Sequence, residues 1–214
     1  CCSHNLDLRR VALIAMCNLC AEPCNMRAAA EYGVVDSLCG LISDCANGGF
    51  AQEMIAHCAG AVLRNCAALD SNRSKLNSKM FFSITETCIA TFDAAVRRLT
   101  INADLEAEWP KVVAAGAAVT ACAHALTGCC GNNMQMNAFK KSALEDLGFV
   151  QLLMQPLHIV RSLCSWFCSD SAKRVTIPEH FPVMEKSFNF LSYCKQQNSC
   201  IISCLSRILE TLGA

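Results

Sequence analysis

Apolar residues recur at the spacing of an α-helix through most of the chain. The spacing is clearest in two proline-free segments, with apolar residues at Val11, Ile14, Ala15 and Leu19 and at Ile55, Cys58, Val62, Leu63 and Cys66. Residues three or four apart share one helix face, so each segment presents a continuous apolar face. No stretch shows the sustained alternation of apolar and polar residues that marks a half-buried strand. The pattern therefore predicts an all-α protein.

Glycine and small polar residues mark the expected helix ends. Breaks are predicted at residues 48–49, 71–72, 131–133 and 169–171. Before the first break we expect a short helix over residues 25–33 and a helix over 34–43, and after it a long helix over 50–69. Asn72 or Ser74 is expected to cap another short helix. A helix from near Phe81 to Leu99 is followed by an acidic insertion, residues 104–108, with Pro110 in the first turn of the next helix.

One short pattern occurs four times, at residues 16–25, 63–72, 126–133 and 191–198, and each copy ends in Asn. We call these copies the junctions and expect each to end an apolar helix at a turn. The third and fourth copies share one register, since Leu126 and Leu191, like Cys129 and Cys194, are 65 residues apart. A constant plan with variable loops is typical of helical repeat proteins. The expected units are 1–23 (the end of a repeat), 24–69, 70–130, 131–195 and 196–214 (the start of a repeat).

The second unit resembles an armadillo repeat, which has an Asn start, a short helix, Gly, an apolar helix and a longer helix closing in Ala-Leu-x-Asn-Leu. The residues that carry the likeness are Asn25, Gly33, Val34, Val35, Leu38, Leu41, Ile42, Ala59, Leu63, Asn65 and Cys66. Residues 12–19 match the same closing pattern. The resemblance is strongest over residues 7–72 and implies a right-handed α-α superhelix, with a HEAT-like solenoid as the alternative for the C-terminal half.

The resemblance also implies a concave groove lined by the third helix of each repeat. In that family the closing Asn and the residues one and two turns before it point into the groove. Carried over to this chain, those positions give the candidate partner-binding residues Asn18, His57, Asn65, His124, Asn189 and Tyr193. They lack the Trp with which importin-α proteins hold basic cargo, so a mixed polar, extended peptide is the expected ligand. The alternative for Asn18 and Asn65 is a hydrogen bond to backbone at a helix end. The alternative for the histidines is packing.

Composition narrows the classes of partner. The 214 residues include 18 Lys+Arg and 18 Asp+Glu, so the formal net charge is zero. A broad basic surface for nucleic acid or anionic lipid is therefore not expected. The charge-free stretch from Val112 is long enough to span a bilayer, but its Ala, Gly, Thr and His favour a packed helix, and no membrane insertion is expected. The chain starts at Cys1 without a signal-like sequence, which favours a fragment of a longer cytoplasmic protein, with the nucleus as the alternative compartment.

The chain is rich in cysteine, with 18 residues, yet also rich in Ala, Leu, Val and Ile. Disulfide frameworks are typical of short secreted chains with small cores, so reduced and buried thiols are expected here. The core cysteines predicted from the pattern are Cys17, Cys58, Cys66, Cys122 and Cys204. The spacing of Cys17, Cys20 and Cys24 begins like a zinc site, but no second C-x-x-C or H-x-x-x-H pair follows. No metal and no cofactor is predicted.

No catalytic residues are predicted either. Residues 192–195 match the S-x-x-K motif of some acyl-transfer enzymes, but the companion motifs are missing. The sequence thus favours a non-catalytic scaffold that binds a protein or peptide. Two alternatives stay open: a regulatory armadillo domain that binds a small molecule or nucleotide, and a cysteine-based redox or metal-responsive module.

Overall fold

The computed structural model describes residues 5–76, 78–102, 104–129, 148–167, 169 and 190–212, and all regular structure within these ranges is helical. The prediction of an all-α protein is thereby confirmed. The helices are α1 (Leu6–Leu19), α2 (Pro23–Glu31), α3 (Val34–Ala46), α4 (Phe50–Cys66), α5 (Asp70–Leu76), α6 (Lys79–Asn102), α7 (Leu105–Cys129), α9 (Phe149–Phe167) and α11 (Phe190–Leu212).

The helices from α2 to α4 follow the sequence prediction closely, because glycines separate them. Gly33 separates α2 from α3 and has a φ of 67°, in the left-handed region that glycine adopts without steric cost. Gly48 and Gly49 separate α3 from α4. Each glycine thus turns the chain where the apolar pattern is interrupted.

The start of α7 differs from the prediction. Asp104 Oδ1 accepts a hydrogen bond of 3.0 Å from the Ala107 backbone N–H, which is the geometry of a helix N-cap. The predicted acidic insertion, residues 104–108, is therefore wrong: these residues form the cap and the first turn of α7. The prediction for Pro110 is also wrong, since Pro110 lies inside the helix, beyond the first turn.

Asn72, expected as a break or a cap, is a buried interior residue of α5. Its Nδ2 donates hydrogen bonds to the carbonyl oxygens of Cys66, at 3.1 Å, and of Met26, at 3.2 Å. Asn25 makes the first of these bonds in the same way, from its Nδ2 to Leu19 O at 2.9 Å. In both cases the Asn at the end of a junction holds a carbonyl six residues earlier, at the end of the preceding helix.

The other two junctions have different outcomes. Asn133 of the third lies outside the described residues. The fourth does not end a helix, because α11 runs without interruption from Phe190 to Leu212, and the expected unit boundary between residues 195 and 196 falls inside it. The physical reason is that residues 190–212 contain neither Gly nor Pro, so nothing in this segment breaks the helix.

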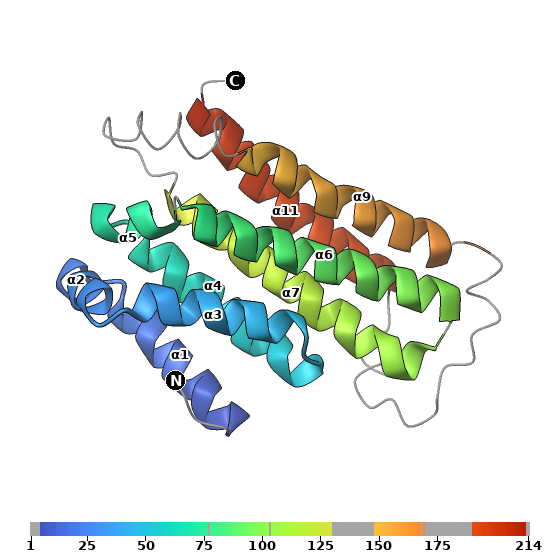
Figure 1. The fold of residues 1–214 in the computed structure, drawn as a ribbon, viewed down its shortest axis with the longest axis horizontal. Coiled ribbons are helices and arrows are strands. Elements are labelled where there is room, and N and C mark those ends of the chain that lie inside the picture. Colours follow the sequence, from blue (N-terminus) through green and yellow to red (C-terminus); the bar gives the residue numbers. More distant parts are fainter. Residues whose placement is uncertain are drawn as a thin grey trace.

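The helices pack in two layers (Figure 1). One layer contains α1, α4, α7 and α11 in that order, and each of these helices contacts the next. The other contains α3, α6 and α9, again with each contacting the next. Between the layers α3 packs on α4, α6 on α7 and α9 on α11. The chain therefore builds the molecule progressively from α1 to α11.

Helices α1, α4 and α7 run parallel to one another. Near their C-terminal ends, Asn65 of α4 donates a hydrogen bond to Cys17 O of α1 at 2.9 Å. Between α4 and α7, Gly60 lies against Ala121. One turn later on α4 and two turns later on α7, the Arg64 backbone lies against Gly128. A contact that moves forward along both helices at once requires them to point the same way.

Helices α7 and α11 are parallel by the same criterion. The Thr120 hydroxyl lies 2.7 Å from Gln197 Oε1, and one turn later on α7 His124 Nδ1 lies 4.0 Å from Cys204 Sγ. Thr120 and Gln197 are both buried, so this polar pair is satisfied within the interface. The four helices of the layer thus all point in one direction.

Helix α7 is the centre of the core. From Val112 to Ala123 every residue is buried, mostly as Ala and Val. The helix has the length and apolar composition of a membrane span, but 89% of its most apolar window is buried inside the protein. A core helix passes the same test, so the finding agrees with the packed helix predicted for this stretch.

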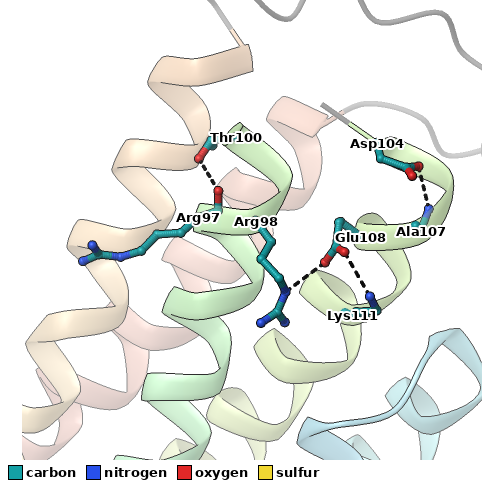
Figure 2. A network of polar contacts seen from close by, with 7 residues as sticks. All are labelled: Arg97, Arg98, Thr100, Asp104, Ala107, Glu108 and Lys111. Atoms are coloured by element: carbon teal, nitrogen blue, oxygen red, sulfur yellow. Dashed lines mark hydrogen bonds and ion pairs between the residues drawn. The ribbon is translucent and has the colours of Figure 1, made fainter. Parts of the chain in front are cut away.

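A largely buried carboxylate joins the end of α6 to the start of α7. Glu108 accepts hydrogen bonds from Arg98 Nε at 3.1 Å and from Lys111 Nζ at 3.0 Å (Figure 2). Burial alone would raise the pKa of Glu108, but the hydrogen bonds and positive charges of Lys111 and Arg98 outweigh it and lower that pKa. The network therefore holds Glu108 ionised and fixes the hairpin between the two long helices.

Candidate functional site

The accessible side of the α1–α4–α7–α11 layer is the candidate site. On α4 it carries a row of half-buried residues one turn apart, Glu53, His57, Ala61 and Asn65, with exposed Arg64 beside the last of them. On α7 only His124 and Gly128 are partly exposed in the C-terminal half. We refer to these residues of α4 and α7, with the neighbouring part of α11, as the α4 face.

The two candidate asparagines have different environments. Asn65 donates from Nδ2 to the Cys17 backbone, and its Nδ2 also lies 3.6 Å from Cys17 Sγ. This is the backbone-bonding alternative raised by the sequence, and it joins α1 to α4. Asn18 is exposed near the end of α1. Its side chain is therefore accessible, while the Asn65 nitrogen is engaged within the protein.

His57 and His124 come together from adjacent helices. Burial lowers the pKa of His57, and the nearby His124 lowers it further because the two rings repel each other when both are charged. Glu53 Oε1 is 3.9 Å from His57 Nε2, an ion pair only when His57 is protonated. Burial raises the pKa of Glu53 and lowers the pKa of His57, so in both side chains it favours the uncharged form. At neutral pH His57 is therefore uncharged.

His124 contacts α11 through Cys204. Its Nδ1 lies 4.0 Å from the buried Cys204 Sγ, within reach of a weak hydrogen bond to sulfur. Burial and the positive charge of Arg64 lower the pKa of His124. Burial also raises the pKa of Cys204. The pair is therefore a neutral thiol beside a neutral imidazole, not the thiolate that nucleophilic catalysis requires.

The remaining two candidate residues are not brought to this contact. Asn189 lies outside the described residues, and Tyr193 lies in the first turn of α11, where only the backbone is described. Cys204, the neighbour of His124, lies eleven residues after Tyr193, which is about 16 Å along a helix axis. The constant 65-residue register of the sequence does not match the packing of α11 on α7.

Sequence reasoning missed Arg64 and Arg207 at this face, and it placed Cys204 in the core without its contact to His124. Arg64 directly precedes the closing Asn65, and Arg207 lies one turn after Cys204, so both were visible in the sequence as charges on predicted helices. Their proximity to His124 depends on how α4 and α11 pack against α7. No spacing rule within one helix provides that information.

The cysteines are mainly packing residues. Of the five predicted for the core, Cys66, Cys122 and Cys204 are buried, while Cys17 and Cys58 are half-buried. Burial and the neighbouring Cys20 raise the pKa of Cys66 to about 12. The Cys88 side chain and burial raise the pKa of Cys122. These thiols stay protonated at neutral pH, as expected of structural cysteines. Within the described ranges, no three His, Cys, Asp or Glu side chains converge on a metal site.

The comparisons with known proteins give no relative for this chain. A scan against protein-family models finds no matching family, and searches of the curated proteins and of the solved structures find no match either.

Proposed function

We propose that this protein is a non-catalytic interaction scaffold of armadillo type, and that it binds a protein or extended peptide on the α4 face. The observation that supports this most is the packing of α1, α4, α7 and α11 as parallel neighbours in one layer. Parallel helices place equivalent positions side by side, so one extended chain can contact several helices at once.

The repeated bond of Asn25 and Asn72 supports the armadillo interpretation. In each junction the Asn side chain donates a hydrogen bond to a backbone carbonyl at the end of the preceding helix. Asn72 also donates a hydrogen bond to the carbonyl oxygen of Met26, the residue directly after the preceding junction. Repeats of one plan that contact their neighbours build a right-handed superhelix, and we propose this architecture for the chain, with the units expected from the sequence as far as residue 130.

The remaining proposals concern nucleic acid, the membrane and the compartment. With zero net charge the protein lacks the excess of Lys and Arg that nucleic acid requires. With α7 packed in the core, no helix described here is proposed to enter a membrane. We assign the protein to the cytoplasm, with the nucleus as the alternative. These assignments agree with a partner that is a protein.

A bulky substitution on the α4 face tests the proposal. Ala61 is half-buried between His57 and Asn65, so Ala61→Trp places a large side chain on the surface without removing a polar group. A partner captured by the intact chain and then purified should lose most of its affinity for this variant in calorimetric titration.

The matched control is Ser162→Trp, which adds the same side chain to the exposed side of α9 in the other layer. We expect this variant to bind like the parent chain. Both variants are first compared with the parent by thermal melting. Retained affinity for Ala61→Trp together with lost affinity for Ser162→Trp would place the partner on the other layer and contradict the proposal.

A further inference from the structure

The outward side of α1 carries a stripe of apolar side chains that solvent reaches. Leu8, Val11 and Leu19 have exposed fractions of 57%, 57% and 58%, and Ala15 between them is also exposed. Their spacing of three or four residues places all four on one face of the helix. We call these four residues the α1 stripe. Ile14, which is 48% exposed, lies beside the stripe and widens the apolar surface.

The α1 stripe faces away from α4, the neighbour of α1 in its layer. Asn65 of α4 bonds to Cys17 O near the end of α1, and Leu13, the buried residue of α1, lies one turn before Cys17. The side of α1 that packs on α4 therefore runs through these two positions. Val11 and Ala15 each precede one of them by two residues, which is about 200° around the helix. The stripe thus lies on the side of α1 that the described helices leave open.

The packing of α1 on α4 does not require the α1 stripe. Leu13 fills that contact and is fully buried. Large apolar side chains that are exposed one at a time are ordinary on protein surfaces, whereas a contiguous group of them marks an interaction surface. A helix that is apolar on opposite sides is typically covered on both. The pattern therefore indicates that a second helix packs on the outward side of α1.

The order of residues in the α1 stripe makes it complementary to itself. Two copies of α1 can cross antiparallel about a two-fold axis, which is the commonest symmetry of protein dimers. With the axis near the middle of the stripe, Leu8 of one copy lies opposite Leu19 of the other. In the same arrangement Val11 lies opposite Ala15, and a small residue at the centre lets the two helices approach closely. Each position of the stripe thus meets another position of the stripe.

Charge favours the antiparallel pair over a parallel one. Asp7 and Asn18 are both exposed, near the two ends of α1 and on the same edge of the stripe. In the antiparallel pair the Asn18 amide of one copy can donate a hydrogen bond to the Asp7 carboxylate of the other, and the symmetry makes this contact twice. In a parallel pair the two Asp7 carboxylates would lie opposite each other and repel. Antiparallel helix dipoles also attract each other.

We propose that two copies of this chain associate through the α1 stripe as an antiparallel, two-fold symmetric dimer. The contact goes beyond the proposed function, because it uses α1 and not the α4 face. Stable protein interfaces typically bury roughly 1,200 to 2,000 Å² in total. Helix α1 has 14 residues and is therefore about 21 Å long, so one stripe from each copy forms a small interface. The dimer is expected to dissociate on dilution.

The experiment measures the mass of the full chain by sedimentation equilibrium over a range of concentrations, in reducing buffer so that no disulfide links the copies. We expect the mass to rise reversibly from the 23.2 kDa of one chain toward twice that value. Val11→Glu/Ala15→Glu places like charges opposite each other at the centre of the contact and should weaken dimerisation at least about tenfold. Val11→Glu/Ala15→Lys places opposite charges there in the antiparallel pair and should restore dimerisation.

The matched control is Met154→Glu/His158→Glu, which adds two carboxylates at the same spacing on the exposed side of α9 and should leave the dimer unchanged. Thermal melting checks that each variant is folded, which we expect because positions 11 and 15 are exposed. A parent chain that is monomeric at every concentration would overturn the inference, and so would a dimer that Val11→Glu/Ala15→Glu leaves intact. Loss of the dimer in the α9 control would also overturn it, and a monomeric Val11→Glu/Ala15→Lys variant would contradict the antiparallel pairing.

Discussion

Gly60 of α4 packs against Ala121 of α7 so closely that an added Cβ at position 60 would lie 2.7 Å from Ala121 Cα. The neighbouring atoms are the Ala121 backbone and its Cβ, which cannot move aside as the end of a long side chain can. Together with Gly128 on Arg64, this contact sets the spacing of the two helices that carry most of the α4 face. The surface proposed to bind a partner therefore depends on small residues beneath it.

The first prediction concerns Gly60. Replacing Gly by Ala inside a helix usually stabilises it by about 0.5 to 1 kcal/mol. At Gly60 the steric conflict with Ala121 should reverse the sign and lower the free energy of unfolding by about 1 to 3 kcal/mol. Urea denaturation measures the change. The control is Gly40→Ala in α3, where an added Cβ meets nothing within 4 Å and stability should rise. Equal gains at both positions would show that α4 and α7 do not approach this closely.

The second prediction concerns the junction asparagines. Asn72→Ala removes two hydrogen bonds and leaves the carbonyls of Met26 and Cys66 without this donor. Because Asn72 is buried, the free energy of unfolding should fall by about 1 to 3 kcal/mol. Asn25→Ala loses one such bond at a half-buried site and should cost less. Chemical denaturation of both variants gives the comparison, and a larger loss at Asn25 would contradict the proposed role of Asn72.

The third prediction concerns Glu108 and acid. Its pKa in the folded protein is lowered from the ordinary value of 4.5, so its contribution to stability is present above pH 4.5 and is lost as the pH falls through the folded pKa. Glu108→Gln should lower stability by about 1 kcal/mol at neutral pH and reduce this acid sensitivity. Thermal melting across the acid range measures both effects. Glu106→Gln, on the exposed side of the same turn, is the control and should leave the acid profile nearly unchanged.

The fourth prediction concerns the two histidines. In the folded protein the pKa values of His57 and His124 are both lowered from 6.5, so the unfolded chain takes up protons first as the pH falls. Their contribution to stability is present above pH 6.5 and decreases as the pH falls through the folded values. His124→Gln should flatten this dependence, since it also removes the repulsion on His57. Melting temperatures across this pH range test it, and an unchanged slope would contradict the burial of the pair.

The helices were predictable where a residue in the local sequence ends them. Local signals placed α2, α3 and α4, because Gly33 and the 48–49 pair end helices through their own backbone preferences. The start of α7 was missed because acidic residues were interpreted as an insertion, although Asp104 is an effective N-cap. The helix end predicted at the fourth junction is wrong. Residues 191–198 resemble the other junctions in sequence, but residues 190–212 contain no Gly or Pro that would end a helix.

The candidate site was predictable only within single helices. The spacing of His57 and Asn65 predicts that they share one face of α4, and the structure places them there. Arg207 could not be assigned beside His124, because that requires the offset between α7 and α11. The offset appears in the Thr120–Gln197 and His124–Cys204 contacts, which are tertiary.

The α4 face as the partner site is tested most directly by photo-cross-linking. A benzoylphenylalanine at position 61 probes the α4 face, and the same residue at position 162 probes the exposed side of α9. With the purified partner present, the account predicts a cross-linked product from position 61 and none from position 162. Capture at position 162 with none at position 61 would contradict it.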